Sequence, residues 1–147
     1  MTDRPAPLPP PVLACTCANL RRAARAITQL YDDALREAGL RSTQFTLLQA
    51  LSLKGELTQR QLGELLAIDS TTLTRTLGGL RGRGWIRSKP GEDRRERHWS
   101  LAPAGRRKVA RAKPEWEAVQ DRVRARIGRE RLSSMFGDLA AIVAAAS

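Results

Sequence analysis

The chain has 147 residues, which is enough for one domain with its own hydrophobic core. Its 26 lysines and arginines outnumber its 15 aspartates and glutamates, and the net charge of +11 favours an acidic polymer or surface as the partner. The two cysteines, Cys15 and Cys17, exclude a disulfide framework, and together with one histidine they exclude a conventional zinc-finger ligand set.

The N-terminal residues 1–14 are rich in proline and are predicted to form a short disordered leader. They lack the continuous apolar segment of a secretory signal, and no later apolar run is long enough to span a bilayer. We therefore expect a cytoplasmic protein with no membrane partner.

Two amphipathic helices are expected next. Residues 15–41 form the N-terminal helix and its end at Gly39, with apolar residues at helical spacing: Leu20, Ala23, Ala24, Ile27, Leu30, Tyr31, Ala34 and Leu35. The second helix begins with Ser42 or Thr43 as its cap and continues to Gly55.

Two shorter helices follow, joined by a tight turn. Thr58 and Gln61 have the spacing of a capping box, so a helix is predicted to begin there. Asp69 is predicted to cap the next helix. In that helix one face is apolar, with Leu73, Leu77 and Leu80, and the opposite face is free, with Thr71, Arg75, Gly78 and Gly82.

A β-hairpin with a basic tip is predicted after Gly84. Its strands are residues 85–88 and 97–101, and the charged, turn-forming residues 89–96 connect them. The final segment, residues 103–147, is predicted to contain helices that pair with a second subunit, with a kink or break at Pro114.

The positive charge is concentrated in one part of the chain. Residues 81–113 contain twelve lysines or arginines and three acidic residues. Such a local concentration is typical of a binding face.

Residues 42–102 therefore have the order of a winged helix-turn-helix, in a mainly α fold with a small β-wing. A helix of this kind fits the major groove of double-stranded DNA, and the hairpin reaches the phosphates or an adjacent minor groove. The predicted DNA-binding residues are Ser70, Thr71, Thr72, Thr74 and Arg75 on the helix, with Arg94, Arg95 and Arg97 on the wing.

The same region resembles the MarR family of transcriptional regulators. The resemblance rests on these residues in order: Leu73-Thr74-Arg75, Leu80, Gly84-Trp85-Ile86-Arg87, Asp93-Arg94-Arg95-Glu96, Leu101 and Gly105-Arg106. It extends over roughly Ala18 to Val143. Family members often have Leu-Thr before the helix that follows the wing, whereas this chain has Leu101-Ala102-Pro103, which puts that helix boundary in question.

The resemblance implies a triangular homodimer that binds a pseudopalindromic operator. It also implies that Arg95 enters the minor groove and that Asp93 supports the wing through an ion pair. The resemblance further implies release from DNA by a small ligand or by thiol modification. Some members of the family sense oxidants, electrophiles or thiophilic metals with cysteines early in the first helix, which makes Cys15 and Cys17 the candidate sensors.

Each of these residues also has a plainer interpretation. Arg75 and the threonines around it also fit a solvated helix face that contacts no DNA. Trp85 and Trp99 are expected to pack rather than to stack on bases. Cys15 and Cys17 are expected to be buried small hydrophobes within the helix, where residues two apart do not face the same neighbour. His98 is expected on the wing surface.

Two competing functions remain. A basic winged-helix protein that binds nucleic acid without sequence preference, or that binds RNA, would need the charge alone. An enzyme has little support, because the sequence contains no phosphate-binding glycine loop, no paired nucleophile and base, and no metal-ligand cluster. We therefore predict no catalytic residues, no metal and no cofactor.

Overall fold

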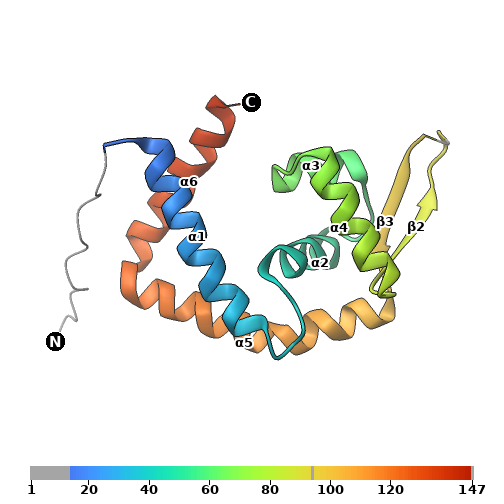
Figure 1. The fold of residues 1–147 in the computed structure, drawn as a ribbon, viewed down its shortest axis with the longest axis horizontal. Coiled ribbons are helices and arrows are strands. Elements are labelled where there is room, and N and C mark those ends of the chain that lie inside the picture. The colour runs from blue at the N-terminus through green and yellow to red at the C-terminus, as the bar shows by residue number, and fades with distance from the viewer. Residues whose placement is uncertain (1–13, 94, 147) are drawn as a thin grey trace. The chain divides into compact units, whose positions relative to one another are not determined.

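The computed structural model describes residues 14–93 and 95–146. The elements, coloured along the chain in Figure 1, are α1 (Thr16–Leu35), α2 (Ser42–Lys54), β1 (Leu57–Thr58), α3 (Gln59–Leu66), α4 (Ser70–Gly82), β2 (Ile86–Pro90), β3 (Arg97–Leu101), α5 (Pro103–Ile127) and α6 (Arg129–Ala145). This confirms the predicted mainly α fold with a small β-wing. The predicted leader, residues 1–14, lies outside the described residues apart from Ala14.

The chain divides into two compact units, and each is described by itself. One unit is Leu35–Pro114, and the other consists of the described residues before Leu35 and after Pro114. Helix α5 contributes its first half to one unit and its second half to the other.

The core of the unit Leu35–Pro114 is built from the apolar faces of its helices and strands. Phe45 on α2 and Leu62 on α3 are almost completely buried, as are the three leucines that the sequence places on one face of α4. The other fully buried side chains of this core are Leu35, Leu47, Leu48, Leu51 and Ile86. Each contributes about 2 kcal/mol by its removal from water. Helical periodicity located the buried face of α4 correctly, whereas of the periodic residues of α1 only Leu35 is buried.

The boundaries of two helices differ from those predicted. Helix α1 ends at Leu35 instead of near Ala38, because the carbonyl of Leu35 accepts the amides of Ala38 and Leu40 at 3.1 and 3.2 Å. Gly39 then adopts a φ of +69°, which turns the chain toward α2. The cap of α2 is Arg41, one residue earlier than predicted, and its amide donates to the side chain of Gln44.

The sheet is three-stranded and antiparallel, with β3 between β1 and β2. The predicted hairpin is confirmed: β2 pairs with β3, with Ser88 opposite Trp99. The sequence did not predict β1, whose Leu57 lies opposite Trp99 on the other side of β3. Two residues are too few to display the alternation by which a strand is recognised.

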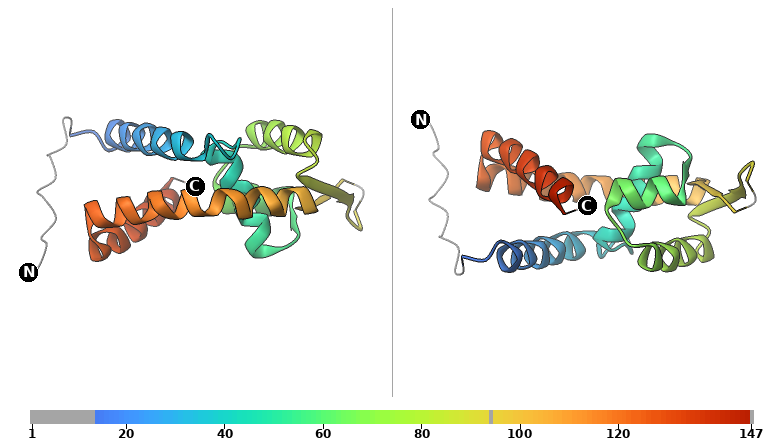
Figure 2. Two further views of the ribbon diagram at one scale, coloured as in Figure 1. Left: turned by 90° about the horizontal axis from the view of Figure 1, so that it is seen from below. Right: turned by 90° about the horizontal axis from the view of Figure 1, so that it is seen from above.

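The end of α4 leads into the wing through Gly84, whose φ of +71° is the left-handed conformation in which glycine commonly ends a helix. The amide of Trp85 bonds to the carbonyl of Leu80 at 3.1 Å, so Trp85 belongs to the helix cap and the strand begins one residue later than predicted. Both views in Figure 2 show the hairpin projecting beyond the helices of its unit.

Trp85 is the centre of a junction between the wing and α5. Two cations lie over its ring, with the Arg83 guanidinium 5.0 Å and the Lys108 ammonium 4.8 Å from the ring centroid. Lys108 also donates to the carbonyl of Ala38 at 2.8 Å. The indole is buried, as is that of Trp99, so the expected packing role of both tryptophans is confirmed.

Helix α5 begins at Pro103, as predicted, and it is helical through Pro114. The predicted break there is therefore wrong. Pro114 removes one backbone donor without ending the helix. Ala102, which lacks a capping oxygen, is buried, and its amide donates to the carbonyl of Trp85 at 3.0 Å.

The second unit contains α1, the end of α5, and α6. Gln120 on α5 donates a hydrogen bond to the Tyr31 hydroxyl oxygen on α1, and Leu132 on α6 is buried. Several large apolar side chains of this unit are more than a third exposed: Ile27, Phe136, Leu139, Ile142 and Val143. No helix within the described ranges is both long enough and apolar enough to cross a membrane.

Gly105 provides a test of the junction around Trp85. A Cβ at this position would lie 2.0 Å from the Trp85 carbonyl oxygen, so Gly105→Ala must displace the backbone of α5 or of the wing. We expect the free energy of unfolding, measured by urea denaturation, to fall by about 1–3 kcal/mol. The control is Gly79→Ala on α4, where a Cβ meets no atom within 4 Å. This change should raise the stability by about 0.5–1 kcal/mol, and equal midpoints for the two variants would contradict the close approach.

Candidate nucleic-acid interface

Helices α3 and α4 form the predicted helix-turn-helix, and both predicted caps are confirmed. The Thr58 hydroxyl accepts from the amide of Gln61 at 3.1 Å, and the Gln61 side chain accepts from the amide of Thr58 at 2.8 Å. Helix α3 ends at Leu66, and its C-cap Ala67, with a φ of +50°, makes the tight turn. Asp69 then caps α4 by accepting from the amide of Thr72 at 2.9 Å.

The cap of α4 is electrostatic as well as geometric. Hydrogen bonds from Thr72 hold the pKa of Asp69 below its usual value, because they stabilise the ionised carboxylate. The negative charge also lies at the positive end of the helix dipole. The start of α4 is therefore held most firmly when Asp69 is ionised.

Helix α4 presents opposite faces to the core and to solvent. Leu73, Leu77 and Leu80 are 1% exposed. The five predicted contact residues of this helix are all exposed: Ser70, Thr71, Thr72, Thr74 and Arg75. Of these, Thr71 and Arg75 lie opposite the leucines. In Figure 1, α4 runs from α3 toward the root of the β2–β3 hairpin. The helix and the wing belong to the same compact unit.

The turn of the wing is held by backbone hydrogen bonds around Asp93. Its carboxylate accepts from the amide of Arg95 at 3.0 Å, and its carbonyl accepts from the amide of Glu96 at 2.9 Å. The amide of Gly91 donates to the carbonyl of Glu96 at 2.9 Å. Within residues 14–93 and 95–146 Asp93 forms no ion pair, so the support it gives there comes from turn hydrogen bonds.

The arginines of the wing differ in their surroundings. Arg95 and Arg97 are both exposed, and Arg97 donates to the Ser88 hydroxyl across the hairpin at 3.2 Å. Arg94, which the sequence also places in the interface, lies outside the described residues.

A cluster of charges near the turn end of the hairpin was missed by the sequence analysis. Glu56 lies 2.8 Å from Lys89 and 3.1 Å from Nδ1 of His98, while Nε2 of His98 lies 3.6 Å from Glu96. The hydrogen bond from Lys89 lowers the pKa of Glu56. His98 is thus half-buried in the sheet rather than free on the surface, and Glu56 belongs to no motif that a sequence reveals.

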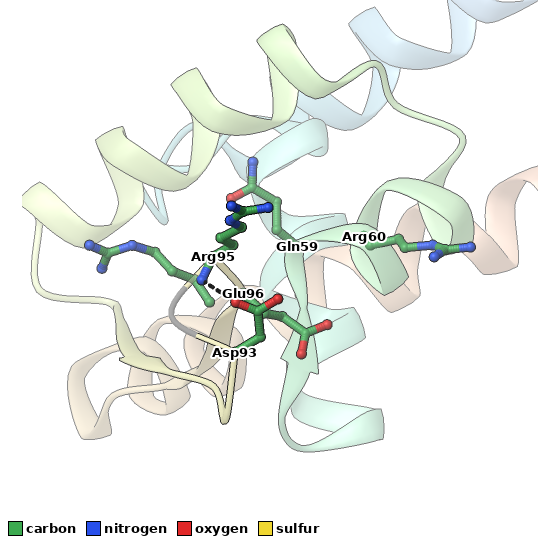
Figure 3. Close-up of a pocket in the computed structure, with 6 residues that line it drawn as sticks. Gln59, Arg60, Asp93, Arg95 and Glu96 are labelled. Atoms are coloured by element: carbon green, nitrogen blue, oxygen red, sulfur yellow. Dashed lines mark hydrogen bonds between the residues drawn. The ribbon is translucent and has the colours of Figure 1, made fainter.

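A hollow of about 500 Å³ lies between the start of α3 and the wing. Figure 3 shows Gln59 and Arg60 from α3 across from Asp93, Arg95 and Glu96 of the wing. Arg60 pairs with Glu64 at 2.8 Å, which raises the pKa of the guanidinium. The sequence analysis assigned Gln59 and Arg60 no role, because only the fold brings them next to the wing.

Two predictions about the cysteines are wrong. Cys15 precedes the first residue of α1, so the two thiols do not share a helix as expected, and both side chains are exposed instead of buried. Over the part of the chain that the structure describes, no three histidine, cysteine or acidic residues are arranged to hold a metal ion.

The helix-turn-helix followed by a hairpin defines the winged helix-turn-helix class, and comparison with known proteins identifies the family. A family model described as MarR family matches residues 38–96. The solved structure of the M. tuberculosis transcriptional regulator MosR in complex with DNA is 37% identical to this chain, with a TM-score of 0.81. That alignment covers 90% of this chain and 98% of MosR. The chain belongs to the MarR family.

Two further proteins are similar to this chain. The MepR–DNA complex of S. aureus has a TM-score of 0.78 at 17% identity, covering 92% of this chain and 100% of MepR, and supports the fold alone. The HTH-type transcriptional regulator YwoH of Bacillus subtilis is 33% identical over 78 residues. That match covers 53% of this chain and 57% of the length of YwoH.

The cap of α4 gives a prediction about pH. Because the pKa of Asp69 is lowered in the folded chain, its contribution to stability is present above the ordinary aspartate pKa of about 4 and is lost as the pH falls below it. Asp69→Asn keeps a capping oxygen that does not titrate. In urea denaturation at pH 6 and pH 3, the variant should lose less stability than the wild type. An equal loss of stability in both proteins would contradict the role of the ionised Asp69 carboxylate in capping α4.

Proposed function

We propose that this chain is a homodimeric regulator that binds double-stranded DNA at a pseudopalindromic operator and represses transcription until an effector releases it. The single observation that carries the proposal is the exposed polar face of α4 beside an arginine-bearing hairpin, within one compact unit. The regulators MosR and MepR have each been solved with DNA, which supports the same ligand here.

In the proposed complex α4 lies in the major groove. Its buried leucines face the core, so Thr71 and Arg75 face the bases and phosphates. An arginine forms a paired hydrogen bond with guanine, which makes Arg75 the proposed main reader of sequence. Ser70, Thr72 and Thr74 complete the proposed contact set on this helix.

The wing is proposed to contact DNA beside the major groove. Arg95 is exposed at its turn and is proposed to enter the minor groove, where narrow A·T tracts concentrate negative potential. Arg97 and, by the sequence alone, Arg94 are proposed to bind phosphates. The turn hydrogen bonds of Asp93 support this arrangement.

The second unit is proposed to form the dimer. The exposed apolar side chains of α6, among them Phe136 and Val143, are the kind of surface that a second subunit covers. In this assignment residues 42–102 form the DNA-binding lobe, while residues 15–41 and 103–147 pair the subunits. Two copies of α4 then read half-sites about one DNA turn apart.

We further propose that a small ligand, or the modification of Cys15 or Cys17, releases the operator. Exposure of both thiols supports the second route, since an oxidant must reach the sulfur. A cytoplasmic location belongs to the same proposal, because the proposed ligand is DNA. The relatives are regulators of transcription, and we propose no enzymatic role.

The alternative is a basic protein that binds nucleic acid without preference, and selection from random duplexes separates the two. We expect wild type to enrich one site from a random-sequence duplex pool and to bind it at least about a thousandfold more tightly than bulk DNA. Arg75→Ala should lose most of this preference, and Arg95→Ala should weaken protection at the flanks of the footprint. Arg122→Ala, which removes an exposed charge from the other unit, is the control.

Two outcomes of this experiment would contradict the proposal. Failure of wild type to enrich any site would favour the alternative, and a chain that sediments as a monomer while bound would contradict the paired arrangement. Affinity for the selected site should also fall steeply as salt rises, because neutralised phosphates release counterions.

The thiol route is tested with hydrogen peroxide, which oxidises a thiolate to a sulfenic acid and is itself reduced to water. We expect mild peroxide to release the selected duplex from wild type, and dithiothreitol to restore binding. The variants Cys15→Ser and Cys17→Ser, and the double variant, locate the sensor. Release from all four proteins alike would show that neither thiol is the switch.

A further inference from the structure

The contact between the start of α3 and the middle of α4 points to a residue that controls specificity, and it rests on the proposed function. Gln59 is the first residue of α3 and is half-buried. It lines the hollow next to the wing, with Arg95 and Glu96, and also a second hollow along α4, with Ser70 and Leu73. Gln59 therefore lies between the two parts of the proposed interface.

The backbone of Gln59 is held from two sides. The preceding residue, Thr58, is buried and forms the capping box of α3 with Gln61. Thr58 also lies opposite His98 in the pairing of β1 with β3. The position of Gln59 is thus fixed to the central strand of the wing before its side chain makes any contact.

The side chain of Gln59 contacts the exposed face of α4. Its Nε2 donates to the Thr74 hydroxyl oxygen at 2.8 Å, across fifteen positions of the sequence. A threonine hydroxyl has one hydrogen to donate, and the amide nitrogen of glutamine cannot accept it. Thr74 therefore uses its oxygen as the acceptor in this contact, and its own hydrogen is directed elsewhere.

A neighbouring threonine shows the contrast. The Thr76 hydroxyl donates to the carbonyl of Thr72 at 2.9 Å, so its hydrogen is used within the helix. Among the described residues the Thr74 hydroxyl donates to no protein group. Its hydrogen is available to an acceptor outside the protein, on the exposed side of α4.

We propose that Gln59 is a positioning residue for sequence recognition: it holds Thr74 as a hydrogen-bond donor to a base acceptor in the major groove. The suitable acceptors are N7 of a purine, O6 of guanine and O4 of thymine. A base that presents an amino group at that place cannot accept the Thr74 hydrogen, so this contact disfavours such a base. Gln59 acts through Thr74 and has no need to contact the base itself.

The test begins with wild type and the random-sequence duplex pool. The variants Gln59→Met and Thr74→Val each remove the contact with a side chain of similar size. For each we expect the ratio of affinity for the selected site to affinity for bulk DNA to fall about tenfold, the upper end of what one hydrogen bond contributes. The double variant should lose no more than either single variant, because both changes remove the same contact.

Matched controls separate this role from a general structural one. Thr76→Val changes a threonine of the same helix whose hydrogen is used within the protein, and Gln49→Met changes a half-buried glutamine on α2. Both should keep the wild-type preference at every base of the site. A loss of preference in these controls equal to that in Gln59→Met would overturn the inference.

A further variant, Gln59→Glu, tests the direction of the hydrogen bond between Gln59 and Thr74. In Gln59→Glu the carboxylate only accepts, so the Thr74 hydrogen must turn toward it and away from the DNA. The added charge weakens binding to all duplexes, but the ratio between the selected site and bulk DNA should fall as it does in Thr74→Val. An unchanged ratio would overturn the proposal.

Three outcomes distinguish this inference from the function on which it rests. If wild type enriches no site, the proposed function fails. If wild type enriches a site and Thr74→Val keeps its full preference, the role of Gln59 alone is overturned, even where Gln59→Met is too unstable to measure. Additive losses in the double variant would equally overturn it, since they would mean that the two side chains act separately.

Discussion

The burial of Leu73, Leu77 and Leu80 determines which way the rest of α4 faces. Turning the helix about its axis would bring these side chains into water, at a cost of about 2 kcal/mol for each one. Thr71 and Arg75 lie on the opposite side of the same helix, so burial of the leucines exposes them to solvent. The proposed reading face is therefore set by apolar packing, and the caps at Thr58 and Asp69 fix where its two helices begin.

The wing must combine a high positive charge with a defined shape. Its exposed arginines repel one another, yet the turn is held by backbone hydrogen bonds to Asp93. The adjoining part of the two strands is held by the pairing of Glu56 with Lys89 and His98. These acidic groups reduce the repulsion near the protein and leave the arginine side chains at the exposed edge. Central placement of β3 joins this hairpin to β1, and through β1 to the start of α3.

Local patterns of the sequence were sufficient for the main elements and for the family. Helical periodicity predicted the buried leucines of α4. The spacing of hydroxyl and carboxyl residues predicted the caps at Thr58 and Asp69, and Gly84 marked the end of α4. Each of these signals depends on neighbours within a few residues, so the sequence alone displays it. The same reasoning failed in two places. Strand β1 has two residues, and the helix α5 continues through Pro114.

Contacts between residues distant in the chain were decided by the tertiary structure. Glu56 beside Lys89 and His98, Lys108 on the ring of Trp85 and Gln59 on Thr74 have partners 15 to 42 positions away, which no periodicity or motif connects. The sequence by itself determined which faces are apolar and where the helices and strands of the interface lie. Only the folded chain decided how the reading helix is held against the wing, because hydrogen bonds and ion pairs act over a few ångströms of space, whatever the separation along the sequence.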